Sequence, residues 1–272
     1  MSAIPLPTTR TGSAGLKTHV SVGATISQSL TMAYRALLRL RRTPEQWFDV
    51  VLQPLIFTPM FAFIFGGAIA GGVDAYLPML IPGILVQTVV TTSIVTGTTL
   101  REDMEKGVFD RFRSLPIARI APLAGALLTD SIRYAIATAL TFLMGWIVGW
   151  RPEGGWWLLL AAVLVIFTAW ALSWVWALLG VLARTAGTVQ GIGLMILFPL
   201  TFLSNAYVPI ETLPEWLGVF AEWNPISHLV TATRELANAG TVGIDFWWTL
   251  LGAAVIVAVF APLTVRAYMR KA

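Results

Sequence analysis

The run WWLLLAAVLVIFTAWALSWVWALLGVL, residues 156–182, decides the fold of this 272-residue chain. It carries no charged residue, and it is longer than the roughly 20 residues that a helix needs to cross about 30 Å of hydrocarbon. Of all residues, 57% are hydrophobic and 12% are charged, about half the charged fraction of soluble domains. The sequence therefore predicts an all-α integral membrane protein with six transmembrane helices. The other five candidate spans cover about residues 47–69, 77–100, 120–149, 188–207 and 246–268.

The motifs and residue types that are missing exclude several kinds of chemistry. The chain has no cysteine, which excludes disulfides, thiol catalysis and thiolate metal sites. It contains no P-loop, no H-E-x-x-H and no G-x-S-x-G, and its two histidines, His19 and His228, are part of no cluster with carboxylates that suits a metal. We therefore expect no catalytic residue, no metal site and no cofactor in this chain. We interpret its net charge of +4 as basic cytoplasmic loops rather than nucleic-acid binding.

The distribution of Lys and Arg predicts the orientation. Fifteen of these residues flank the spans on one side, whereas Arg151 and Arg234 fall on the other and Arg133 falls within a span. Because cytoplasmic loops carry the excess of Lys and Arg, we expect both termini in the cytoplasm and the protein in a bacterial cytoplasmic membrane. Residues 1–25 lack an apolar signal core and are predicted to be a disordered cytoplasmic tail.

Two segments outside the spans are predicted to lie at the membrane surfaces. Residues 26–43 carry apolar side chains at helical spacing and arginines on another face, which indicates an amphipathic interfacial helix. Residues 208–240 are apolar but are divided by prolines into two pieces that are too short to span. We expect an extracellular re-entrant helix pair there, with a helix pair capping the outer surface as the alternative. The transmembrane domain would then cover residues 47–272.

One pair of opposite charges lies inside a predicted span. Asp130 and Arg133 are three residues apart, so they share one helical face and can pair. We interpret them as a structural ion pair that holds this helix against its neighbours. The alternative is a polar lining of a substrate path or a proton relay. Four other polar residues of the spans are expected to join helices by hydrogen bonds rather than to bind a ligand: Gln53, Gln87, Gln190 and Asn205.

The most charged run is REDMEKGVFDRFRSLPIAR, residues 101–119, between the second and third spans. Its apolar residues recur on one helical face, and Pro116 ends the helix. Its charges alternate in sign, whereas a helix that binds lipid head groups would be mostly basic. A helix that inserts aromatic side chains into a soluble cytoplasmic partner therefore fits better than a surface anchor. The apolar residues are Val108, Phe109, Phe112 and Leu115.

This loop resembles the cytoplasmic loop of the permease subunits of type-2 ABC exporters, in particular those of the daunorubicin/doxorubicin-resistance group. The resemblance covers about residues 26–270. It is carried by EKGVFDRFRSLPIAR at 105–119, by LIPG at 80–83, by the exit from the fifth span at 203–209 and by WNP at 223–225.

The resemblance implies a non-catalytic permease subunit that exports a hydrophobic or amphipathic molecule, namely a drug, lipid or glycolipid. It implies two copies of a separate ATPase that binds ATP and Mg, a second permease that is identical or homologous, and a surround of membrane lipids. The substrate path would lie between the two permeases, lined by helices one, two and five, although no motif identifies its residues. Residues 104–115 would be the coupling helix that docks in the ATPase. The implied ATPase-coupling residues are Glu105, Lys106, Val108, Phe109, Arg111, Phe112, Arg113 and Leu115.

Other functions stay open at this point. Within the same class, the substrate could be a polysaccharide or a teichoic-acid-like polymer. An ion-coupled secondary transporter would need paired buried acids rather than a docking helix, and a membrane anchor without transport is the third class.

Overall fold

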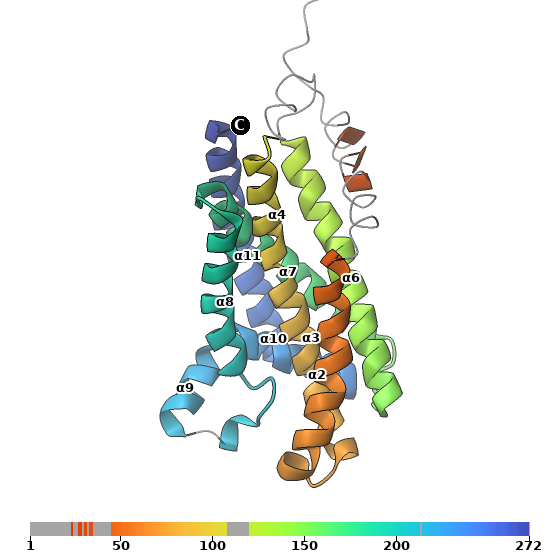
Figure 1. The fold of residues 1–272 in the computed structure, drawn as a ribbon. Helices are drawn as coiled ribbons and strands as arrows, with labels where there is room; N and C mark the ends of the chain where they lie inside the picture. Colours follow the sequence, from red (N-terminus) through yellow and green to blue (C-terminus); the bar gives the residue numbers. More distant parts are fainter. Residues whose placement is uncertain are drawn as a thin grey trace, which may run out of the picture.

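The fold is all-helical in the part of the chain that the computed structural model describes, which is residues 45–107, 120–212, 214–271 and a few positions between 23 and 34. This confirms the all-α prediction, and Figure 1 shows the long helices running side by side. The elements are α2 (Glu45–Ala70), α3 (Val73–Thr92), α4 (Ile94–Glu105), α6 (Ala121–Val148), α7 (Trp157–Leu182), α8 (Ala186–Phe202), η1 (Ile210–Thr212), α9 (Glu215–Trp223), α10 (Pro225–Arg234), η2 (Glu235–Ala239) and α11 (Ile244–Lys271).

Five helical segments are long and apolar enough to cross a membrane. A sixth helix, α8, is apolar but has 17 residues. At 1.5 Å per residue it extends about 25 Å, less than the roughly 30 Å of a bilayer core. Five of the six predicted spans are therefore found. The remaining one, which is the fifth along the sequence and is expected at 188–207, stays a prediction. The five segments are Val50–Ala70, Val73–Glu105, Ala121–Val148, Trp157–Leu182 and Ile244–Lys271.

The helices α3 and α4 together form the centre of the bundle. In the most apolar stretch of Val73–Glu105, 83% of residues are buried, against 17% in the corresponding stretch of Ile244–Lys271. The helices α4 and α7 cross in backbone contact at two glycines. A Cβ atom on Gly97 would lie 2.3 Å from the carbonyl oxygen of Trp176, and one on Gly180 would lie 2.4 Å from the carbonyl oxygen of Gly97. A side chain at either position would therefore force these helices apart.

The second predicted span, 77–100, is two helices separated by a turn at Ser93. The Ser93 hydroxyl donates to the carbonyl oxygen of Val90 at 2.5 Å, and it accepts a hydrogen bond of 2.8 Å from the indole Nε1–H of Trp176 in α7. A serine side chain that bonds to its own backbone competes with the regular helical pattern. The side-chain bond therefore accounts for the interruption, and Trp176 holds it in place.

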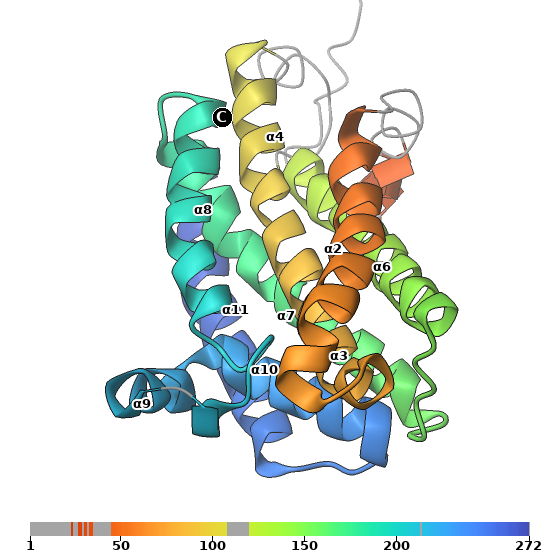
Figure 2. The ribbon, with the colours of Figure 1, turned by 60° about the horizontal axis from the view of Figure 1, so that its bottom comes forward.

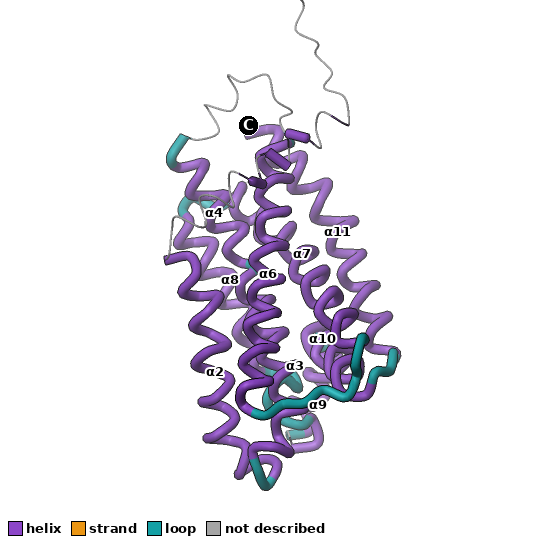
Figure 3. The backbone as a smooth tube through the Cα atoms, turned by 90° about the vertical axis from the view of Figure 1, so that its right-hand side faces the viewer, coloured by secondary structure: helices purple, strands orange, loops and turns teal. Residues whose placement is uncertain are grey.

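The segment after α8 forms short helices at the end of the molecule opposite to the C-terminus (Figures 1 and 3). Figure 2 shows α10 beneath the bundle and α9 projecting away from it. Pro214 and Pro225 start α9 and α10, as the division by prolines predicts. On α9, Trp216 and Trp223 are 73% and 82% exposed. Re-entry of this pair into the membrane stays a prediction.

The described part of the predicted interfacial helix, at scattered positions from 23 to 34, is helical. Ala33 is buried, and its carbonyl oxygen accepts a hydrogen bond of 3.2 Å from Thr129 in α6. Leu30 and Tyr34 are exposed. The arginine-bearing face and most of the tail at 1–25 lie outside the described residues, so the interfacial position stays a prediction.

Candidate functional site

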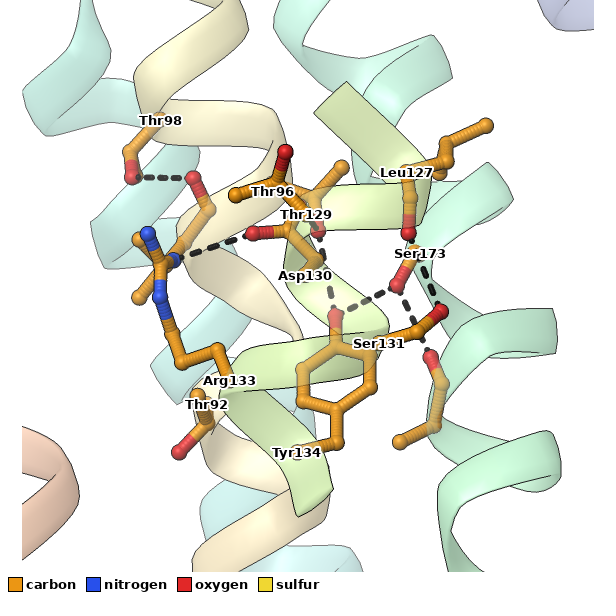
Figure 4. Close-up of polar contacts among 12 residues, drawn as sticks. Thr92, Thr96, Thr98, Leu127, Thr129, Asp130, Ser131, Arg133, Tyr134 and Ser173 are labelled. Atoms are coloured by element: carbon orange, nitrogen blue, oxygen red, sulfur yellow. Dashed lines mark hydrogen bonds and ion pairs between the residues drawn. The ribbon is translucent and has the colours of Figure 1, made fainter. Parts of the chain in front are cut away.

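A buried polar cluster joins the helices α4, α6 and α7 (Figure 4). We define it as Thr96, Asp130, Arg133, Tyr134 and Ser173, each at most 5% exposed. The Thr96 hydroxyl donates to Asp130 Oδ2 at 2.6 Å and lies 3.2 Å from the Tyr134 hydroxyl. That hydroxyl in turn lies 2.6 Å from Ser173 Oγ. The cluster therefore fastens three helices through an unbroken set of polar contacts.

The predicted pairing of Asp130 with Arg133 is present in the structure. Arg133 Nη1 lies 3.1 Å from Asp130 Oδ1. The Nε and Nη1 groups of Arg133 are nevertheless buried without a well-oriented acceptor among the described residues. The contact is thus one between charges rather than an aligned hydrogen bond. Its central position among three helices supports the structural interpretation.

A groove of about 360 Å³ lies between α2, α3, α4 and α8. Apolar side chains of α2 line it, and the lining also includes Gln53 of α2 and Gln190 of α8. Neither amide makes a hydrogen bond to a described residue, and the same holds for Gln87, so their expected role in joining helices is not seen within this chain. Asn205 does join two segments, because its Nδ2 group donates to Thr231 Oγ1 at 2.8 Å.

Stacked aromatic rings link α2 to α8 on the outer side of this groove. The ring centroids of Phe57 and Phe61 are 5.7 Å apart, and those of Phe61 and Tyr207 are 4.7 Å apart. The stack continues to Phe202 at 5.4 Å and on to Phe198 at 4.3 Å. Phe57 belongs both to this stack and to the lining of the groove, so the two features adjoin.

The predicted ATPase-coupling residues are only partly described. Glu105 and Lys106 lie at the end of α4, where each forms an exposed ion pair of 3.1 Å one turn back, with Arg101 and Glu102 respectively. These pairs support the last turn of the helix that leads into the loop. The remaining predicted residues lie outside the described part of the chain: Val108, Phe109, Arg111, Phe112, Arg113 and Leu115.

The other motifs that carry the resemblance meet at the end of the bundle opposite the C-terminus. A Cβ atom on Gly83 of the LIPG motif would lie 2.1 Å from the carbonyl oxygen of Ala206, so the glycine permits close contact with the segment that follows α8. Asn224 of the WNP motif caps α10 by accepting from the Ile226 backbone N–H at 2.9 Å. It also donates to the Leu200 carbonyl oxygen at 2.7 Å. Three motifs that are distant in sequence therefore build one contact region.

Five helical segments long and apolar enough to cross a membrane, with a charge pair buried between helices, define a multi-pass membrane protein. The chain belongs to the ABC-2 type transporter family, whose model matches residues 27–237. It is 43% identical to the daunorubicin resistance ABC transporter permease protein DrrB1 of Streptomyces coeruleorubidus, over 94% of this chain and 93% of that protein. The family predicted from the loop is thereby confirmed.

More distant relatives belong to the same class of protein. The chain is 25% identical to the probable doxorubicin resistance ABC transporter permease protein DrrC of Mycobacterium tuberculosis, over 80% of this chain and 79% of that protein. It is 22% identical to the inner membrane transport permease YadH of Escherichia coli, over 73% of this chain and 78% of that protein. Members of the family are the membrane components of ABC transporters and do not themselves bind ATP, so the chain is expected to work with an ATPase.

Sequence reasoning found the ion pair but missed the hydroxyl groups around it. Tyr134 stands one helical turn after Asp130, a spacing that could have been noticed. Thr96 and Ser173 come from other helices, and nothing in their local sequence marks them. The reasoning also missed a contact at the end of the bundle opposite the C-terminus, where His228 Nδ1 lies 2.5 Å from Asp245 Oδ1.

Proposed function

We propose that this chain is the transmembrane permease subunit of an ATP-driven exporter in a bacterial cytoplasmic membrane. Its substrate is a hydrophobic or amphipathic molecule of the drug, lipid or glycolipid type, and a separate ATPase subunit supplies the energy. The observation that carries this proposal is the groove between α2, α3, α4 and α8, which is lined by four apolar side chains, two threonines and two amides without a partner in the described structure. The drug-resistance name of the relative DrrB1 supports a drug-like substrate.

In the complete transporter, two such permeases, identical or homologous, pair with two ATPase subunits. The groove opens toward the second permease, so that the substrate path lies between the two. The helix α8 makes the sixth crossing, which leaves both termini in the cytoplasm. Basic residues at one end of the bundle support this orientation: Arg101, Lys106, Arg184, Arg266, Arg270 and Lys271.

Residues 104–115 transmit the movement of the ATPase to the bundle. The aromatic and leucine side chains of this segment supply the buried contact area, and its charged residues set the orientation. The helix α4 leads directly into the segment and is joined to α7 at the glycine contact and to α6 through the buried polar cluster. A push on the loop therefore moves three helices together, which suits a transport cycle between two discrete arrangements.

The structure favours this function over polymer export and over ion-coupled transport. A cavity of about 360 Å³ lined by Leu52, Ile56 and Phe57 suits a compact amphipathic molecule better than a hydroxyl-rich polymer. An ion-coupled transporter would need paired acids within the membrane. In the described part of the spanning helices, Asp130 is the one carboxylate whose residue is nine-tenths buried, and it is already paired with Arg133.

The coupling step is tested with the variant Phe112→Asp. We expect the variant to insert normally but to lose both copurification with the ATPase and export of daunorubicin from cells. The matched control is Val242→Asp, which places the same charge in an exposed position at the opposite end of the bundle. Unchanged capture of the ATPase by Phe112→Asp would contradict the docking of residues 104–115.

The groove is tested by filling it. We expect Gln53→Trp to abolish export of daunorubicin while capture of the ATPase stays intact, because the indole would occupy the cavity, whose lining includes no residue of the predicted coupling segment. The matched control is Leu159→Trp, at a side chain that is 71% exposed on α7. Export at the wild-type rate in Gln53→Trp would show that the substrate path runs elsewhere.

A further inference from the structure

A second cavity, which we call the outer cavity, lies at the outer end of the bundle. Its volume is about 590 Å³, and it is enclosed by α3, the segment after α8, α9, α10 and the first turn of α11. Seven of its eleven lining residues are polar, and four of those seven carry titratable groups. In a chain with 12% charged residues, this concentration of polar side chains marks the cavity as a binding site rather than a packing defect. It shares no lining residue with the groove.

The charged groups of the outer cavity leave one carboxylate available. Arg234 donates through Nη2 to two backbone carbonyl oxygens, those of Met79 at 3.1 Å and Asn205 at 3.0 Å. Asp245 is bonded to His228 at 2.5 Å. Glu222 on α9 is exposed and makes no ion pair or hydrogen bond to a described residue. Because Asp245 is bonded to His228 and Arg234 to backbone carbonyl oxygens, Glu222 is the carboxylate of the described lining that is left to pair with a ligand. An unpaired carboxylate favours a ligand with an ammonium group and disfavours an anion.

The neutral groups of the wall offer unused hydrogen-bonding capacity. Ser227 is 4% exposed and its hydroxyl oxygen has no partner among the described residues. Asn205 is 6% exposed, and its amide is bonded at one atom, to Thr231, while Oδ1 has no partner in the described structure. Turning the amide over would exchange the two atoms and place the nitrogen where Oδ1 now lies. One amide atom therefore lacks a bond in either orientation. Buried polar groups normally find a partner, and a small rotation of these side chains would bring them to a hydroxyl-bearing ligand.

We propose that the outer cavity binds an amino-polyol, a group with several hydroxyls and one ammonium and about the size of an amino sugar. The ammonium pairs with Glu222 at the rim, and the hydroxyls bond to Asn205, Ser227 and Thr231 in the wall. Such a group can belong to a soluble molecule or to the head group of a lipid in the outer leaflet. This inference goes beyond the proposed function and does not depend on it, because the isolated permease carries the whole site.

The ligand class is tested with three matched sugars. The permease is placed in phosphatidylcholine nanodiscs, free of sugar-based detergent, and titrated with glucosamine, glucose and glucose 6-phosphate under saturation-transfer NMR. We expect saturable binding of glucosamine, binding of glucose weaker by about two- to fivefold because one exposed ion pair is lost, and no binding of glucose 6-phosphate. The site is overturned if no sugar saturates, or if glucose 6-phosphate binds as well as glucosamine.

Two variants assign the contacts. Glu222→Gln is expected to lower the affinity for glucosamine to that for glucose while leaving glucose binding unchanged. Ser227→Ala is expected to weaken both sugars. Glu153→Gln, at an exposed carboxylate on the same end of the molecule, is the control and should change neither. Thermal unfolding of each variant is measured in parallel, and a correctly folded Glu222→Gln that retains the preference for glucosamine overturns the assignment of the ammonium.

The source of the group is distinguished in a second arm. An alkyl glucosaminide is incorporated in the nanodisc bilayer, and its competition with soluble glucosamine is measured. Competition assigns the site to a lipid head group that reaches it from the outer leaflet. If soluble glucosamine binds with unchanged affinity in the presence of the lipid, the site takes a soluble molecule.

Discussion

Replacing Arg133 with methionine should destabilise the protein by leaving the Asp130 carboxylate buried without its cation. Breaking a buried ion pair by removing one partner costs about 3–5 kcal/mol. Here the Thr96 hydroxyl still donates to the carboxylate at 2.6 Å, and such a charge-assisted bond contributes about 1.5–3 kcal/mol. The free energy of unfolding should therefore fall by about 3 kcal/mol, at the lower end of the range for a broken buried pair. For a chain of this size that corresponds to a fall in Tm of roughly 6–12 °C.

The double variant Asp130→Asn with Arg133→Met gives the decisive comparison. Asparagine keeps an oxygen that accepts from Thr96, and removing both charges of a buried pair is often neutral, so we expect stability within about 1 kcal/mol of the wild type. Unfolding is followed by intrinsic tryptophan fluorescence in one detergent, with Arg184→Met as the control at an exposed arginine.

The reasoning is refuted by either of two results. Arg133→Met could unfold at the wild-type temperature, or the double variant could be as unstable as the single one. A stable Arg133→Met that has lost export would instead favour the alternative reading, in which the pair lines a substrate path or relays protons.

Three further predictions concern packing and titration. Gly97→Ala should lower the free energy of unfolding by about 1–3 kcal/mol, because its Cβ would lie 2.3 Å from the Trp176 carbonyl oxygen; thermal unfolding measures this. Trp176→Phe should lose about 1 kcal/mol with the hydrogen bond to Ser93 Oγ, by the same measurement. The pKa of the Glu235 carboxyl lies above its ordinary 4.5, mainly because the group is buried and secondly because the Asp245 carboxylate is near. A hydrogen bond from a backbone N–H partly opposes this rise. The unfolded state therefore releases this proton first, so the wild type should lose stability as pH rises from 4.5 through the raised folded pKa, and Glu235→Gln should reduce that loss.

Long apolar runs allowed most helices to be predicted from the sequence. The span predicted at 156–182 is found at Trp157–Leu182, since no charge or helix-breaking residue interrupts it. The span predicted at 77–100 differs more, because the interruption at Ser93 depends on a side-chain bond and on Trp176 from another helix. The fifth predicted span corresponds to α8, which ends at Phe202 rather than near residue 207. Beyond Phe202 the chain turns toward the contact between Ala206 and Gly83.

Local spacing also decided how much of the candidate site could be predicted. Asp130 and Arg133 are three residues apart, so helix geometry alone brings them together. Thr96 and Ser173 reach the same cluster only through the packing of α4, α6 and α7, which hydropathy does not encode. The groove and the outer cavity likewise depend on how separate helices meet. The coupling residues between 108 and 115 stay predictions, since they lie outside the described part of the chain.

The placement of both charges of the buried pair on one helix has a consequence for biogenesis. When α6 leaves the ribosome, α7 has not yet been synthesised, so Ser173 cannot support the pair at that stage. The carboxylate and the guanidinium are one turn apart and 3.1 Å from each other, so each compensates the other within α6 itself. The translocon can therefore release this helix to lipid at a lower free-energy cost than two separated charges would impose. Charges divided between two helices would instead have to wait for the second helix to be inserted.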